Sequence, residues 1–197
     1  MDELGPATEH EMVLAFVQAE VDAPRWRDLY VWALQQIGAT RALIDRPDLT
    51  SGAENAKRID ILRRVRGYRG NEYLFRGFPL DTTWRRVRLP PLQFDLLRQC
   101  TGAPAFIELS RGTRRVVDAA AYLGQFRTPT SQNVRAVVQA LKTGKTYPPL
   151  IAVDSGEGEL LLVEGYTRAT AYAALRPPRP VEFFIGTSPN IRRWGFY

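Results

Sequence analysis

The sequence predicts an α+β protein with a helical first third and a small mixed sheet, flanked by helices, towards its end. Two observations support this. Between residues 9 and 69, apolar residues recur at helical spacing, three or four positions apart. Later, two short apolar runs at 150–153 and 160–163 have the length of buried strands and are separated by a polar turn. The second run leads through Gly165 into an alanine-rich segment, a pattern typical of a strand, a tight turn and a helix.

Residues 1–70 are expected to form a helical N-terminal region. Helices are predicted over 9–21, from Asp22 to Gly38, and over 53–69. Acidic residues such as Glu20 and Asp60 interrupt any uniformly basic face, so we expect these helices to pack together rather than lie on lipid. They are also the expected contact surface for a protein partner.

Residues 71–197 are expected to form a second domain. Its predicted elements are short strands at 72–75 and 84–89, a helix from 90 to 97, a segment at 105–109 that fits either a helix or a strand, helices opening at 110 and 128, and a strand at 181–185. The C-terminal segment Trp194–Tyr197 is expected to pack into the core, because it would otherwise form an exposed apolar patch.

The composition indicates what class of protein this is and which types of catalytic or metal site it can contain. With 197 residues, 45% of them hydrophobic, the chain has the composition of a globular protein with one core of ordinary size. The apolar runs are far shorter than a membrane span, and no apolar leader is visible, so a soluble cytoplasmic protein is expected. Cys100 is the single cysteine, and we expect it to be a small core residue within a helix. His10 is the single histidine, which excludes a histidine-based triad or zinc site.

Positive charge is concentrated in one stretch. The formal net charge is +6, and between residues 58 and 88 nine arginines face three acidic residues, an excess of six. Such clustering suits a polyanion such as DNA, although an arginine-rich solvated surface explains it equally well. The candidate DNA contacts here are Arg58, Arg63, Arg66, Arg69, Arg85 and Arg86.

A second basic group opens the helix predicted at residue 110. Arg111, Arg114 and Arg115 would lie on one side of its first turn, where positive charge opposes the helix dipole. A phosphate group of a nucleic acid would relieve that repulsion. Glu108, Asp118 and solvent are the alternative source of relief.

The strongest candidate for a functional site is the segment Glu164-Gly165-Tyr166-Thr167-Arg168. A helix N-terminus offers unpaired N–H groups, and an arginine beside them makes a pocket suited to phosphate or another oxyanion. Two structural alternatives stay open. Arg168 can instead pack across Tyr172, four residues on, and Glu164 can simply satisfy local N–H groups.

The order of elements from residue 131 to 186 supports a family assignment. A predicted helix at 134–141 leads through Gly144–Pro149, a Gly-x-x-x-Pro-Pro turn, into an apolar strand and a hairpin, and then reaches the acidic-Gly-x-x-Arg turn at 164–168. This order resembles the ParB/sulfiredoxin superfamily over roughly the last third of the chain. The resemblance implies a ParB/sulfiredoxin-like fold for residues 71–197.

The same resemblance implies a phosphate pocket at the turn. Gly165 would let the backbone approach a ligand, amides near Tyr166 and Thr167 would form the cradle, and Arg168 would clamp a phosphate oxygen. Glu164 would hold a metal ion such as Mg²⁺ or orient a nucleophile. Relatives that use nucleotides suggest ATP or CTP as the ligand.

Departures from the family pattern decide between its branches. Sulfiredoxin chemistry needs a cysteine within the turn, where this chain has Tyr166 and Thr167, so sulfinate reduction is not expected. The helix-turn-helix that follows this core in chromosome-partition members is not expected either. The remaining hypotheses are an ATP or CTP hydrolase or nuclease associated with DNA, a non-catalytic DNA- or nucleotide-binding module acting through a protein partner, and an interaction protein that retains the motif as a remnant.

Overall fold

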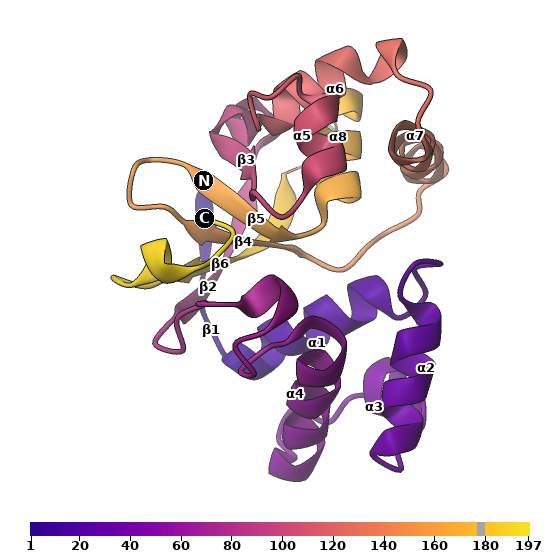
Figure 1. Ribbon diagram of the computed structural model, residues 1–197, viewed down its shortest axis with the longest axis vertical. Coiled ribbons are helices and arrows are strands. Elements are labelled where there is room, and N and C mark those ends of the chain that lie inside the picture. The colour runs from indigo at the N-terminus through magenta and orange to yellow at the C-terminus, as the bar shows by residue number, and fades with distance from the viewer. Residues whose placement is uncertain (177–179) are drawn as a thin grey trace.

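The computed structural model, which describes residues 1–176 and 180–197, consists of a six-stranded mixed sheet between two groups of helices (Figure 1). The strand order is β1-β2-β6-β4-β5-β3. The β4–β6 and β3–β5 pairs are parallel, and the other neighbours are antiparallel. The strands are β1 (Asp2–Ala7), β2 (Thr83–Leu89), β3 (Leu97–Gln99), β4 (Leu150–Asp154), β5 (Leu160–Glu164) and β6 (Val181–Thr187). The α+β class is thus confirmed.

Both faces of the central strands are buried, which explains their continuous apolar runs. Along β4, Ile151 and Val153 join the core shared with the N-terminal helices, whereas Leu150 and Ala152 join the core on the opposite face. This alternation follows from the two-residue period of a strand, which places successive side chains on opposite faces of the sheet. Every side chain of β5 is buried.

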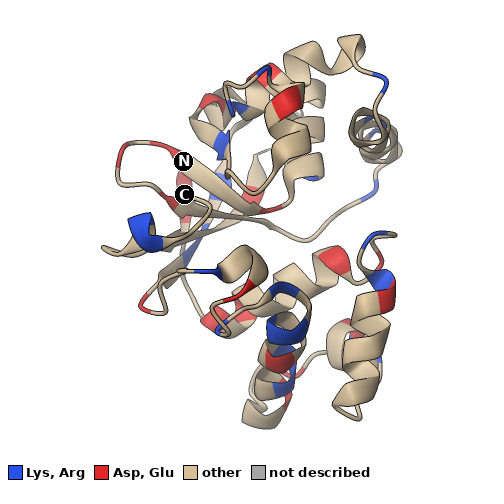
Figure 2. Ribbon diagram, in the orientation of Figure 1, with Lys and Arg blue, Asp and Glu red and all other residues tan. Residues whose placement is uncertain are grey.

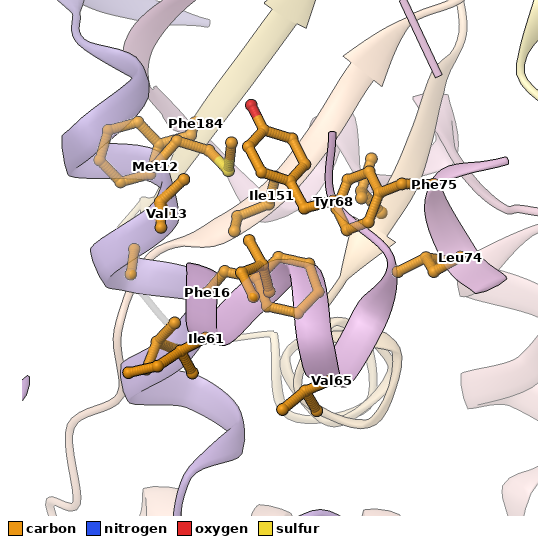
Figure 3. Close-up of a cluster of buried hydrophobic side chains, with 14 of the residues drawn as sticks. Met12, Val13, Phe16, Ile61, Val65, Tyr68, Leu74, Phe75, Ile151 and Phe184 are labelled. Carbon is orange, nitrogen blue, oxygen red and sulfur yellow. The ribbon is translucent and has the colours of Figure 1, made fainter. Parts of the chain in front are cut away.

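The N-terminal helices cover one face of the sheet. They are α1 (Glu9–Glu20), α2 (Arg27–Gln36), α3 (Ala42–Asp45) and α4 (Gly52–Arg66). Thr8 and Glu11 form a capping box that begins α1. Figure 3 shows Phe16 of α1 and Ile61 of α4 in one cluster with Ile151 of the sheet. The helix expected to reach residue 69 ends at Arg66, because Gly67 takes the left-handed conformation that closes a helix.

The other face is covered by α5 (Pro104–Leu109), α6 (Val116–Tyr122), α7 (Pro129–Lys142) and α8 (Tyr166–Leu175). The predicted Thr128 cap of α7 is present, since its side chain accepts a hydrogen bond from the Ser131 N–H. Residues 105–109, which suited helix or strand, are helical. A smaller core fills the space between these helices, with Leu109, Val134 and Ala171 at its centre.

Several sequence predictions are wrong in detail. Residues 73–75 form a 3-10 turn rather than a strand, and Asn71 and Tyr73 have positive φ angles of 56° and 44°. The helix expected from 90 to 97 is a 3-10 turn over Pro91–Leu96, after which β3 begins. Cys100 therefore follows a strand and lies in no helix, although its expected burial in the core is confirmed. Trp194 is 2% exposed, which confirms the core position expected for the C-terminal segment.

The region 1–70 is not wholly helical, because it begins with a strand. β1 pairs antiparallel with β2, so the first residues of the chain belong to the same sheet as residues 71–197. The pairing has a bulge between Glu3 and Gly5, and nothing in this polar segment had suggested a strand. Within the described residues, none of the helices combines the length and the apolar character needed to cross a membrane.

Candidate functional site at the turn between β5 and α8

The predicted glycine turn is present. Gly165 has a φ of 97°, and α8 begins at the next residue. A Cβ atom at Gly165 would lie 2.3 Å from a methyl carbon of Leu150, so no larger residue fits this backbone without displacement of its neighbour. The turn therefore brings the start of α8 directly against β4 and the end of β5.

Arg168 does not face an open hollow. Its side chain is 7% exposed, forms an ion pair with Glu164, and donates a second hydrogen bond to the Pro148 carbonyl. The phosphate pocket expected in front of the guanidinium is therefore closed in this conformation of the described residues. The physical reason is that Glu164, buried at the end of β5, requires a counter-charge, and Arg168 lies one helical turn away.

The Glu164 carboxylate, like the Arg168 guanidinium, is buried in the protein. Burial raises the pKa of its carboxyl, while the charges of Arg168 and Arg66 lower it. In the described part of the chain, no group of three or more His, Cys, Asp or Glu side chains is arranged to hold a metal ion. Phosphate binding by Arg168, and catalysis or metal binding by Glu164, would each require this pair to open.

Tyr166 and Thr167, which lie between Gly165 and Arg168, differ in whether their hydroxyl groups are accessible from solvent. The Tyr166 hydroxyl donates to the Val163 carbonyl at 3.1 Å and lies 2.9 Å from the Cys100 sulfur, so it points into the protein. Thr167 is partly exposed, and its hydroxyl makes no hydrogen bond to a described residue. Of the two side chains, only that of Thr167 is placed to meet a ligand from solvent.

A second enclosed carboxylate lies in the N-terminal helices. Glu20 of α1 is 6% exposed, and burial raises its pKa to about 7. It accepts a hydrogen bond of 3.0 Å from the Tyr30 hydroxyl, and the Arg66 Nε lies 3.6 Å from it. The sequence analysis counted Glu20 among the acidic residues of the helix surface, which is wrong because the side chain is buried. The sequence does carry a signal for this burial, since Glu20 falls in the apolar stripe that Val13 and Phe16 define on α1.

A groove of about 370 Å³ lies against the loop whose Pro148 carbonyl Arg168 holds, and no residue from 164 to 168 lines it. The loop from Gly144 to Pro149 forms one wall, and Tyr172 of α8 together with residues 180–182 forms another. The Lys145 ammonium lies 5.1 Å from the centre of the Tyr147 ring. Because Arg168 holds the Pro148 carbonyl, it links the groove wall to the buried cluster. The sequence had indicated two parts of this groove, the Gly144–Pro149 turn and Tyr172, the latter only as a packing partner for Arg168.

Two members of the first set of predicted DNA contacts, Arg58 and Arg66, are enclosed in the protein. Arg58 is 1% exposed and hydrogen-bonds to the carbonyls of Leu43 and Asp48, so its assignment to a DNA surface is wrong. The side chain of Arg66 is 13% exposed, which argues against the same role. Figure 2 shows basic and acidic positions interleaved along α4. The side chains of Arg63, Arg69 and Arg86 are 42–50% exposed, and each pairs with a carboxylate: Asp60, Glu9 and Glu182 respectively. Arg85 is partly buried, and its Nε is enclosed.

The second set does not form a stripe. α6 begins at Val116, so Arg111, Arg114 and Arg115 precede the helix instead of opening it. Arg111 and Arg114 have left-handed φ angles of 54° and 63°, which turn the side chains apart. Arg111 lies over Tyr122, Arg114 donates to the Gln99 carbonyl, and Arg115 lies 3.8 Å from Asp118. The arrangement expected from helical spacing is therefore wrong.

Three apolar side chains of α2 are exposed. Leu29, Val31 and Trp32 of α2 are each between 44% and 47% exposed. They lie within the region where a protein partner is expected, and that expectation stays a prediction.

Comparison with models of protein families, with curated proteins and with solved structures finds no match to this chain.

Proposed function

We propose that the groove beside the β5–α8 turn binds a nucleotide, and that the protein is a binding module of ParB/sulfiredoxin type rather than a hydrolase. One observation carries the proposal. Two tyrosine rings and a lysine line the groove, whose wall is held in place by the arginine of the acidic-Gly-x-x-Arg turn. The volume of about 370 Å³ falls within the range of small-molecule sites.

The lining matches the two halves of a nucleotide. Tyr147 and Tyr172 offer aromatic surface on which a base can stack. Lys145 offers an ammonium group for a phosphate and forms no ion pair with a described residue. Glu182, the carboxylate that also lines the groove, pairs with Arg86 and Arg88. ATP and CTP both satisfy this description.

Nucleotide binding without hydrolysis is favoured because the Glu164 carboxylate is already paired with Arg168. A carboxylate that activates water or holds a metal ion near a phosphate must face the ligand. Glu164 instead lies buried against Arg168. DNA is not part of the proposal, because the arginines nominated for it are buried, paired or turned apart.

Calorimetric titration with ATP and CTP tests the proposal. We expect measurable binding that Lys145→Ala and Tyr172→Ala each weaken by roughly tenfold, the change that corresponds to about 1.4 kcal/mol. Lys57→Ala, an exposed lysine of α4 outside the groove, is the matched control and should bind as the unmodified protein does. Absence of binding, or equal affinity in all four proteins, would overturn the proposal.

An assay of nucleotide hydrolysis distinguishes a non-catalytic binding module from a hydrolase. Hydrolysis of ATP or CTP with Mg²⁺ that disappears in Glu164→Gln, while that variant still binds nucleotide, would establish the hydrolase instead. Binding that survives Glu164→Gln without turnover in either protein supports the module.

A further inference from the structure

Two side chains of opposite charge line the groove without pairing with each other. Lys145 belongs to the wall formed by the Gly144–Pro149 loop, and Glu182 belongs to the wall formed by Tyr172 and residues 180–182. Lys145 forms no ion pair with a described residue, and the partners of Glu182 are two arginines of β2. The groove therefore suits a ligand with an anionic group at one end and a hydrogen-bond donor at the other.

The Glu182 carboxylate is held in place and is still accessible. Arg86 donates to its Oε2 at 3.1 Å, and Arg88 donates to its Oε1 through Nη2 at 3.1 Å and through Nε at 3.3 Å. The side chain is 32% exposed, so a ligand can reach it. A carboxylate offers about four lone-pair positions, and the arginines occupy only one of those on Oε2. Glu182 can thus accept a further hydrogen bond without leaving its partners.

Glu182 also differs from the other polar side chains of the groove in hydrogen-bonding polarity. The hydroxyl groups of Thr146, Tyr147 and Tyr172 can each donate or accept, and Lys145 only donates. Among the described residues that line the groove, Glu182 has the one side chain that accepts without donating. A fixed acceptor attracts a donor and repels another acceptor, so it can distinguish bases whose edges differ in this respect.

We propose that Glu182 is a specificity-determining residue, which selects nucleotides whose base carries an exocyclic amine over nucleotides with a carbonyl at that position. This inference rests on the proposed nucleotide site. The amine of cytosine or adenine donates to the Glu182 carboxylate, whereas the 4-carbonyl of uracil would face it with a second acceptor. Because Glu182 repels phosphate and Lys145 attracts it, the phosphate lies towards Lys145 and the base towards Glu182.

Calorimetric titration with CTP and UTP tests this selection, since the two nucleotides differ in the hydrogen-bonding edge of the base. The unmodified protein should bind CTP at least roughly tenfold more tightly than UTP. In Glu182→Gln the ratio should fall to roughly threefold or less, because an amide can turn either its donor or its acceptor to the base. Glu157→Gln, which alters a carboxylate that is paired with Arg192 and does not line the groove, is the control and should keep the ratio.

The outcomes separate the selection from the proposed site. If the unmodified protein binds no nucleotide, the site is refuted and the selection with it. If it binds CTP and UTP equally, or if the preference for CTP persists in Glu182→Gln, the selection alone is refuted.

Tripolyphosphate distinguishes recognition of the base from mere support of the groove wall. It has no base, so Glu182→Gln should bind it at least as tightly as the unmodified protein does. If this variant binds CTP, UTP and tripolyphosphate more weakly by one common factor, Glu182 only supports the wall and the selection is refuted.

A CTP analogue with hydrogen in place of the 4-amino group tests the selection on the unmodified protein, where the folding of a variant plays no part. The analogue lacks the donor but brings no repelling acceptor. It should therefore bind more weakly than CTP and more tightly than UTP. Binding as tight as that of CTP would show that the amine makes no contact, and the selection would be refuted.

Discussion

Replacement of Arg58 by methionine should destabilise the protein more than any surface change. Arg58 is 1% exposed and makes four hydrogen bonds. Two of its acceptors, the Leu43 carbonyl and the Asn55 amide oxygen, lie at 2.9 and 2.6 Å in buried surroundings. The other two, on Asp48 and Glu54, are only partly buried. Methionine preserves the apolar stem of the side chain but removes every donor.

The buried acceptors set the size of the effect. A hydrogen bond to a charged group contributes about 1.5–3 kcal/mol, and an acceptor left unsatisfied inside the protein loses that amount. The Asp48 and Glu54 acceptors can bond to water instead and contribute little. We therefore expect Arg58→Met to lower the free energy of unfolding by about 3–5 kcal/mol, the range seen when one partner of a buried charged contact is removed.

Urea unfolding followed by circular dichroism measures this loss. Lys57→Met, at the preceding and exposed position of α4, is the matched control and should change stability by less than about 0.5 kcal/mol. Arg58→Lys, which keeps the charge but loses the planar fork, should fall between the two. A loss below about 1 kcal/mol for Arg58→Met would refute the reasoning and make a surface role for this arginine tenable again.

Three further predictions concern stability. Because Glu20 keeps its proton up to about pH 7 in the folded protein but loses it near pH 4.5 when unfolded, stability should fall as pH rises between those values, by on the order of 3 kcal/mol, and Glu20→Gln should flatten that part of a pH series of urea curves. Trp194→Ala should cost about 3–5 kcal/mol in the same assay, since the indole is 2% exposed and its N–H bonds to the Leu74 carbonyl; a change near zero would show that this segment is not core. Gly165→Ala should lower the melting temperature by several degrees, about 1–3 kcal/mol of strain, whereas Gly124→Ala, where a Cβ meets nothing within 4 Å, should not; equal effects would contradict the steric argument.

Regular elements with a clear period were predictable from the sequence. The apolar stripes of α1 and α4, the buried runs of β4 and β5, and the Thr128 cap each leave a local pattern that packing then reinforces. Elements without such a pattern were missed. β1 contains Gly5 and Pro6 and few apolar residues, and β3 has three residues, so both depend on a neighbouring strand rather than on their own composition.

The site was predictable only in part. The Gly165 turn and the position of Arg168 follow from the local sequence. The orientation of the guanidinium does not, because it depends on the burial of Glu164 and on the Pro148 carbonyl, which is distant in the chain. The contacts of Glu20 with Tyr30 and Arg66 are a consequence of how the N-terminal helices pack together, and no spacing along the chain encodes them.

The β1–β2 pairing makes the whole N-terminal helical layer an insertion between two hydrogen-bonded neighbours. By topology alone, residues 8–82 could be deleted and β1 joined to β2 by a short hairpin turn. All hydrogen bonds between the strands of the sheet would then be kept. Such a deletion would nevertheless be destabilising, because it would expose the side chains of Ile151, Val153 and Phe184 to water. Cutting the chain at residue 70 is equally unfavourable, because it strips β1 from β2 and leaves a bare sheet edge prone to aggregation.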